Sequence, residues 1–192
     1  MNNKPTIIGI GELLWDMLPM GKKVGGAPVN FAYHASLLGA ASYAISAVGY
    51  DSLGDEIIQA IDKVKVNRII ERVNYPTGTV LVELKDGIPN YTIIEGVAWD
   101  YIPITEAMIQ LVKRADAVCF GTLAQRSEVS RETILTLLSY VPEDSYRILD
   151  VNIRQHYYTK EIIVTSLRSS NVFKINDDEL ILLKELFEKQ SF

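Results

Sequence analysis

The chain has little cysteine, no excess of basic residues and no long hydrophobic run. Cys119 is the single cysteine among 192 residues, which excludes an intrachain disulfide and a zinc site built on cysteines. The net charge of −5 argues against nonspecific nucleic-acid binding, which needs a basic face. No apolar run reaches the length of a membrane span, and the first residues lack a signal-peptide segment. We therefore expect a cytoplasmic protein without nucleic-acid or membrane partners.

Buried-type strands alternate with helical patterns along most of the chain. The first strand, 6–10, is apolar on consecutive residues, as strands covered on both faces are. Such alternation predicts an α/β fold with a parallel sheet flanked by helices, in which ligands bind beyond the carboxyl ends of the strands. The predicted strands are 6–10, 43–48, 69–73, 117–121, 146–151 and 172–175, and the predicted helices are 28–38, 51–64, 105–113, 127–140, 160–169 and 177–187.

One segment, residues 79–95, has a different pattern of apolar and polar residues. Two short strands, 79–85 and 88–95, flank Asp86-Gly87, which is a strong signal for a β-hairpin. Val80 and Val82 alternate with Leu81 and more polar residues, so one face of this hairpin is predicted to be exposed. We interpret it as an insertion in the α/β fold that can act as a small lid.

The run Gly25-Gly26-Ala27-Pro28-Val29-Asn30 predicts a ligand-binding turn at the start of a helix. Glycines let backbone amides approach a ligand, and proline suits the first helical turn. The helix N-terminus offers free N–H groups, and Asn30 adds an amide one turn later. Asp16, just past the first strand, could accept hydrogen bonds from sugar hydroxyls. By itself, the glycine run could equally be a loop that enters a helix, and Asp16 alone is more simply a turn residue or a solvated loop acid.

Two further motifs follow strands near the end of the chain. Asp150-Val151-Asn152-Ile153-Arg154 places polar side chains at alternate positions, and Arg154 could pair with a carboxylate or phosphate. Asn176 and Glu179 have the spacing of a helix-capping box. The same two residues could hold magnesium and its waters beside a phosphate. Sequence alone slightly favours the cap, and both roles are compatible.

Two other enzyme classes fit the sequence poorly. Gly9 and Gly11 begin a dinucleotide-binding fingerprint, but Leu14 occupies its third glycine position and no helix begins there. His156 has no serine or cysteine nucleophile motif near it, so a hydrolase triad is unsupported.

Taken together and in this order, the motifs resemble those of the ribokinase-like carbohydrate kinases, the PfkB family, with fructokinase-like members nearest. The resemblance covers nearly the whole chain. It rests on Gly9-Ile10-Gly11-Glu12 with Asp16, the Gly25–Ala32 run, Pro76-Thr77-Gly78-Thr79-Val80, Glu95-Gly96-Val97-Ala98-Trp99-Asp100, Asp150–Arg154 and Asn176–Glu179.

The resemblance implies transfer of the ATP γ-phosphoryl group to a sugar hydroxymethyl group. Asp16, Gly25, Gly26, Asn30 and Arg154 would bind the sugar. Asn176 and Glu179 would lie near magnesium and phosphate. Residues 1–192 would form the N-terminal part of one ribokinase-like domain, with lid segments at about 12–25 and 76–101 and a homodimer as the expected assembly.

One family signature does not occur in these 192 residues. It is a Gly-Ala-Gly-Asp turn that supplies the catalytic aspartate and a helix N-terminus for the phosphate. We therefore expect no catalytic residue in this chain, a missing C-terminal part of the fold and little kinase activity by the chain alone. The alternatives are a non-catalytic sugar-binding or regulatory protein derived from such a kinase, and a fragment without an independent role.

Overall fold

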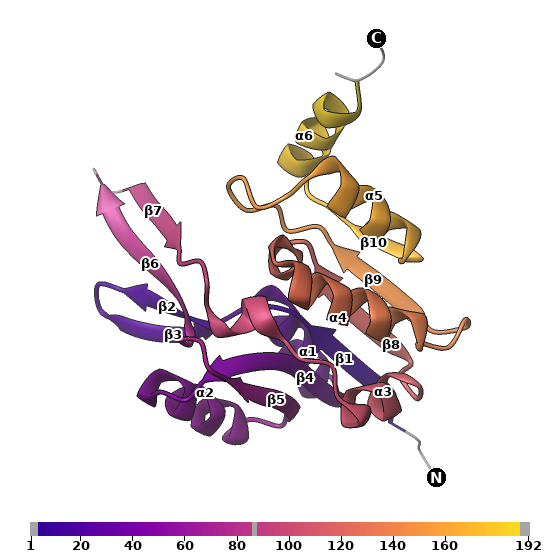
Figure 1. Cartoon of the computed structure of the whole chain (residues 1–192), viewed down its shortest axis with the longest axis horizontal. Coiled ribbons are helices and arrows are strands. Elements are labelled where there is room, and N and C mark those ends of the chain that lie inside the picture. The colour runs from indigo at the N-terminus through magenta and orange to yellow at the C-terminus, as the bar shows by residue number, and fades with distance from the viewer. Residues whose placement is uncertain (1–3, 86–87, 189–192) are drawn as a thin grey trace.

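The computed structural model describes residues 4–85 and 88–188, which form two sheets of different kinds (Figure 1). The main sheet has six parallel strands in the order β10-β9-β8-β1-β4-β5. Its first strand in the chain, β1, therefore lies inside the sheet between β8 and β4. The strands are β1 (Thr6–Ile10), β4 (Ala41–Gly49), β5 (Asn67–Val73), β8 (Ala117–Gly121), β9 (Tyr146–Asp150) and β10 (Val172–Lys174).

Helices cover both faces of the main sheet, and each face has its own hydrophobic core. Along β4, Ile45 and Ala47 belong to one core, and Ala44 and Val48 belong to the other. This alternation is what a two-sided strand requires. The first core packs α3 and α4 on the sheet, and the second packs α1 and α2. The helices are α1 (Ala27–Leu37), α2 (Ser52–Asp62), α3 (Glu106–Val112), α4 (Glu128–Ser139), α5 (Lys160–Arg168) and α6 (Asp177–Glu188).

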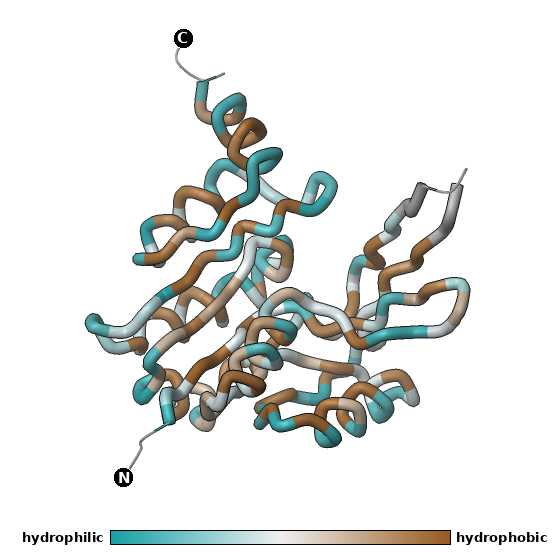
Figure 2. The backbone as a smooth tube through the Cα atoms, turned by 180° about the vertical axis from the view of Figure 1, so that it is seen from behind, coloured by the Kyte–Doolittle hydropathy of each residue, from teal (hydrophilic) through white to brown (hydrophobic). Residues whose placement is uncertain are grey.

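The predicted parallel sheet flanked by helices is confirmed, and α2, α3 and α5 each begin at a side chain that caps the helix. The Asp51 side chain accepts a hydrogen bond from the Gly54 amide, so α2 begins one residue later than predicted. Thr105 caps α3 in the same way through the Met108 amide. Figure 2 shows hydrophobic residues gathered along the strands of the main sheet.

The second sheet has four strands, two of which the sequence patterns did not predict. Its order is β3-β2-β6-β7, with β2 (Leu14–Leu18), β3 (Gly21–Gly25), β6 (Gly78–Lys85) and β7 (Ile88–Ile93). Strands β6 and β7 pair antiparallel, as the hairpin pattern predicts, and the Asp86-Gly87 turn lies outside the described residues. Strands β2 and β3 are five residues long and partly exposed, which leaves a weak sequence pattern. We call this second sheet the lid sheet.

The two faces of the lid sheet contact different parts of the molecule. Trp15 is buried against α2, and its indole N–H donates to the Leu53 carbonyl at 2.9 Å. Asp16, the next residue, lies on the opposite face, opposite Val80 in the register of β2 and β6. Because side chains alternate between the two faces of strand β2, Trp15 anchors the lid sheet on one face and the Asp16 carboxylate lies on the other.

The far edge of the main sheet is less covered than its centre. All three residues of β10 are exposed, and Phe173 keeps 39 % of its surface accessible. Helix α6 projects beyond this edge (Figures 1 and 2) and leaves Leu180 and Ile181 exposed. No helix in the described part of the chain is both long and apolar enough to cross a membrane.

Candidate functional site

A cavity of about 650 Å³ lies where the carboxyl ends of the main-sheet strands meet the lid sheet. It is the place where a parallel sheet is expected to bind ligands. Four of the predicted sugar-binding residues, Asp16, Gly26, Asn30 and Arg154, line it together. The other lining residues are Glu12, Leu14, Ala27, Val80, Tyr91, Ile93, Leu123, Asn152, Ile153 and Gln155.

The two glycines of the predicted ligand-binding turn let the chain pack closely against strand β2 and against Glu12, which lies just before that strand. Gly26 is the N-cap of α1 and has a φ of 119°, and a Cβ there would overlap the Glu12 carbonyl oxygen. A Cβ on Gly25 would overlap a carboxylate oxygen of Asp16. Gly25 does not itself line the cavity, but its missing side chain leaves room for Asp16 to do so. The run therefore shapes the cavity wall through close approach of the backbone.

Glu12 is a buried carboxyl group in the wall of the cavity. Its side chain is nearly inaccessible, and its Oε1 accepts a hydrogen bond from the Ala27 amide at 3.0 Å, in the first turn of α1. Its Oε2 is buried and finds no hydrogen-bond partner within the described residues. Burial raises the pKa of Glu12 to about 7, although backbone hydrogen bonds and the positive charge of Arg154 oppose the shift. Glu12 therefore exchanges a proton near neutral pH.

Asp16 reaches the same cavity from strand β2 and is only partly covered. Burial raises its pKa above the ordinary aspartate value, and the nearby charge of Arg154 partly opposes this. A half-buried carboxylate with free lone pairs can accept hydrogen bonds from ligand hydroxyls. Asn30 lines the same cavity from α1, and its side-chain amide can both donate and accept.

Arg154 belongs to the loop that follows β9, and this loop bends sharply. Asn152 and Gln155 both have positive φ, of 42° and 47°, in the left-handed region. The side-chain Nε2 of Gln155 donates to the Tyr91 carbonyl of β7 at 2.7 Å, which ties the loop to the lid sheet. Arg154 itself is exposed at the cavity, and its positive charge acts on both Glu12 and Asp16.

The predicted pair Asn176 and Glu179 does not line the cavity. It forms a capping box at the start of α6: the Glu179 amide donates to Asn176 Oδ1 at 2.8 Å, and the Asn176 amide donates to Glu179 Oε2 at 3.0 Å. Glu179 Oε1 accepts a third bond, from the Ile153 amide at 2.9 Å. The pair therefore contacts the loop of Arg154 through its backbone.

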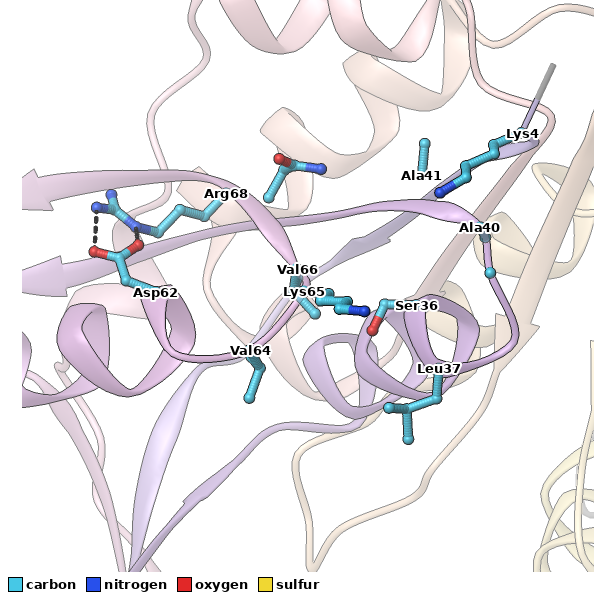
Figure 3. A pocket seen from close by; sticks show the side chains of 12 residues that line it. Lys4, Ser36, Leu37, Ala40, Ala41, Asp62, Val64, Lys65, Val66 and Arg68 are labelled. Carbon is cyan, nitrogen blue, oxygen red and sulfur yellow. Dashed lines mark hydrogen bonds and ion pairs between the residues drawn. The ribbon is translucent and has the colours of Figure 1, made fainter. Parts of the chain in front are cut away.

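A second hollow, of about 900 Å³, lies at the other end of the main sheet (Figure 3). It is bounded by Lys4 before β1, Ala41 at the start of β4 and residues just before β5. The one ion pair drawn in Figure 3 joins Arg68 to Asp62, with 2.7 Å between Nε and Oδ1. None of the predicted site residues lines this hollow.

Sequence reasoning passed over Glu12, Tyr91 and Gln155 as site residues. Glu12 carried one usable signal, because it directly follows an apolar strand and precedes two leucines, and such apolar neighbours are usually buried. Tyr91 and Gln155 carried none, since their place at the cavity depends on how the lid sheet and the β9 loop meet.

The fold occurs in known proteins, among them sugar kinases and fructokinases. The uncharacterized sugar kinase PH1459 from Pyrococcus horikoshii has a crystal structure that matches with a TM-score of 0.83 and 28% identity, over 94% of this chain and 66% of that one. A fructokinase of Salmonella typhimurium is 27% identical over 95% of this chain. The fructokinase of Xylella fastidiosa, at 21% identity and a TM-score of 0.85, shares the fold over 97% of this chain.

The chain spans 64% of the length of the Pyrococcus protein and 63% of the Salmonella fructokinase. The family model for pfkB family carbohydrate kinases matches residues 12–189, which include every residue of the cavity wall. On this match, the chain belongs to the pfkB family of carbohydrate kinases.

Proposed function

We propose that this chain forms the sugar-binding part of an ATP-dependent carbohydrate kinase and binds a fructose-like sugar in the 650 Å³ cavity. The observation that carries the proposal is the meeting of Asp16, Asn30 and Arg154 in one cavity, beside a wall shaped by Gly25 and Gly26. Carboxylate, amide and guanidinium groups at one site suit the many hydroxyls of a sugar.

Each cavity residue has a role in this proposal. Asp16 accepts hydrogen bonds from two neighbouring hydroxyls, and Asn30 orients the sugar ring from α1. Arg154 covers the open side of the cavity, with the apolar side chains Val80 and Ile93 of the lid sheet beside it. Together, Asp16, Asn30 and Arg154 bind the sugar and orient its acceptor hydroxyl, because phosphoryl transfer depends mainly on positioning and charge stabilisation.

ATP would be the phosphoryl donor of the complete enzyme. The Pyrococcus sugar kinase has been crystallised in complex with ATP, and that structure is 29% identical to this chain over the 93% it covers. The Gly-Ala-Gly-Asp turn that the family resemblance associates with the catalytic base is not among these 192 residues. We therefore place sugar binding in this chain and expect little turnover from it alone.

Magnesium would accompany ATP, and Asn176 and Glu179 fit it only through its waters. In the described residues, no three His, Cys, Asp or Glu side chains are grouped as metal ligands. The Glu179 oxygens already accept backbone hydrogen bonds, so their remaining lone pairs suit the hydrogens of water bound to the ion. The ion would supply positive charge beside the phosphates.

Calorimetry with fructose and related sugars tests the sugar site. We expect Asp16→Asn to weaken binding about 10- to 100-fold, because hydrogen bonds to a charged group contribute about 1.5–3 kcal/mol. Asp62→Asn removes a carboxylate in the hollow at the other end of the sheet and should leave affinity unchanged. An unchanged affinity in Asp16→Asn, or no binding of any sugar by the wild-type chain, would contradict the proposal.

Calorimetry with fructose, with and without ATP, separates the kinase from a non-catalytic sugar-binding or regulatory protein. Sugar binding without ATP binding favours the second function. In a turnover assay with ATP and fructose, robust product formation by the chain alone would overturn our expectation of low activity.

We also propose a cytoplasmic homodimer, and light scattering of the purified chain measures its mass directly.

A further inference from the structure

The loop that carries Arg154 is held at its base by helix α6. The peptide between Asn152 and Ile153 directs the Ile153 amide at Glu179 Oε1, 2.9 Å away. The Glu179 side chain comes from the first turn of α6, 26 residues later in the chain, and Glu179 keeps only 7% of its surface accessible. A buried carboxylate in the first turn of a helix is stabilised by the positive end of the helix dipole. The bond is therefore charge-assisted and shielded from water.

The same loop is held at its other end by the lid sheet. Besides the Gln155 bond to Tyr91, the Tyr157 hydroxyl has two acceptors within reach of its one hydrogen, Glu95 Oε1 at 2.8 Å and the Ile93 carbonyl at 3.2 Å. The Tyr157 ring lies 4.6 Å from the Arg126 guanidinium. Residues 153–157 thus connect α6 to the end of β7, and Arg154 stands between the two attachments.

Arg126 extends the connection into the base of the lid sheet. It forms a buried ion pair with Asp100, with 2.8 Å between Nε and Oδ1, and donates to the Ile94 carbonyl at 2.7 Å. Ile94 directly follows β7. A shift of the loop that moves Tyr157 would therefore disturb the strand whose residues Tyr91 and Ile93 line the cavity.

We propose that Glu179 is a positioning residue of the sugar site, which holds the Ile153 backbone so that Arg154 and strand β7 face the cavity together. The proposal rests on the proposed sugar site and differs from a role in metal binding. A glutamate that acted only through magnesium would leave sugar binding unaffected when no metal is present. A glutamate that positions the loop affects sugar binding with or without metal.

The substitution Glu179→Gln separates the loop contact from the cap. Glutamine is accepted at this position of a capping box, so its one carbonyl oxygen can retain the Asn176 amide. The Ile153 amide then faces an NH₂ group and loses its acceptor. Asp178→Asn is the matched control, because it removes one charge from the same helical turn at an exposed side chain. Asn176→Ala opens the cap and leaves the glutamate carboxylate in place.

We expect Glu179→Gln to weaken fructose binding about 5- to 20-fold in buffer containing EDTA, since a charge-assisted hydrogen bond is lost. Asp178→Asn should bind as the wild type does, and Asn176→Ala should lose less than Glu179→Gln. An affinity for sugar that falls in Glu179→Gln only when magnesium is added would overturn the positioning role. So would an affinity that does not fall at all.

Amide hydrogen exchange measured by NMR gives a readout that needs no sugar. We expect exchange of the Ile153 amide to rise at least about tenfold in Glu179→Gln, with a smaller rise at the β6–β7 amides and no rise in Asp178→Asn. Unchanged exchange at Ile153 would overturn the positioning role. If the wild-type chain binds no sugar while the Ile153 amide still exchanges faster in Glu179→Gln, the sugar-site proposal fails and the structural contact stands.

Discussion

The two sides of the candidate sugar cavity are built by different means. One side, made of Glu12, Asp16 and the turn at Gly25–Gly26, is fixed by close packing of the two glycines, Gly26 against the Glu12 backbone and Gly25 against the Asp16 side chain. The other side, made of the Arg154 loop and strand β7, is fixed by hydrogen bonds from side chains of distant elements. We call them the packed side and the tethered side.

Because the two sides are held differently, they should respond differently to substitutions. The packed side tolerates no added atom, because its glycines lie directly against a carbonyl and a carboxylate. The tethered side tolerates changes of side chain but depends on a few polar contacts, each of modest net stability. Substitutions on the packed side should therefore alter global stability, and those on the tethered side should alter local opening and ligand affinity.

The largest effect is expected from Gly26→Ala. The new Cβ would overlap the Glu12 carbonyl, and φ of 119° is itself unfavourable for alanine. We expect a loss of about 3–5 kcal/mol in the free energy of unfolding, measured by urea denaturation. Gly39→Ala is the matched control, since Gly39 also has positive φ but its Cβ would meet open space.

The Gly39→Ala control should cost about 1 kcal/mol, the strain of the backbone alone. Equal losses in the two variants would contradict the view that the packed side is fixed by close approach. If Gly26→Ala loses much more free energy of unfolding than Gly39→Ala does, the difference measures the steric overlap of the new Cβ.

The packed side also carries a dependence of stability on pH, because Glu12 has a pKa of about 7 when folded and an ordinary value near 4.5 when unfolded. Between these values the folded state keeps a proton that the unfolded state has released. Stability should therefore fall as pH rises from about 4.5 to about 7, by about 3 kcal/mol in all. Above that range the contribution of Glu12 is constant.

Urea denaturation at a series of pH values measures this dependence. Glu12→Gln cannot ionise, so its stability should lose the part of the slope that Glu12 contributes. Glu132→Gln, on the exposed surface of α4, should keep the slope of the wild type. A slope that is the same in Glu12→Gln and in the wild type would show that Glu12 is not the titrating group.

Sequence predicted the packed side better than the tethered side, for a physical reason. Two glycines followed by Pro28 at a helix start depend on local backbone chemistry, which a short motif records. The main-sheet strands are apolar runs, and the parallel sheet follows from their alternation with helices. Strand β2 was missed because it is short and divides into two buried residues, among them Trp15 against α2, and three that are only partly buried.

The tethered side could not be read from local sequence. The Ile153 amide and Glu179 are 26 residues apart, and Gln155 and Tyr91 are 64 apart. The capping-box spacing predicted the hydrogen bonds within α6, but nothing in that spacing indicated a third bond to the β9 loop. Such contacts depend on the packing of whole elements and become visible only in the assembled fold.

The smallest effect is expected from Tyr157→Phe, on the tethered side. The substitution removes the hydroxyl that bonds to Ile93 and Glu95 and keeps the ring beside Arg126. Because these bonds are partly exposed, we expect a loss of about 0.5–1 kcal/mol, confined to local opening. Exchange of the β7 amides should rise about 2- to 5-fold while the global free energy of unfolding changes little. A loss of global stability as large as that of Gly26→Ala would show that the two sides form one packed unit and would remove the distinction between them.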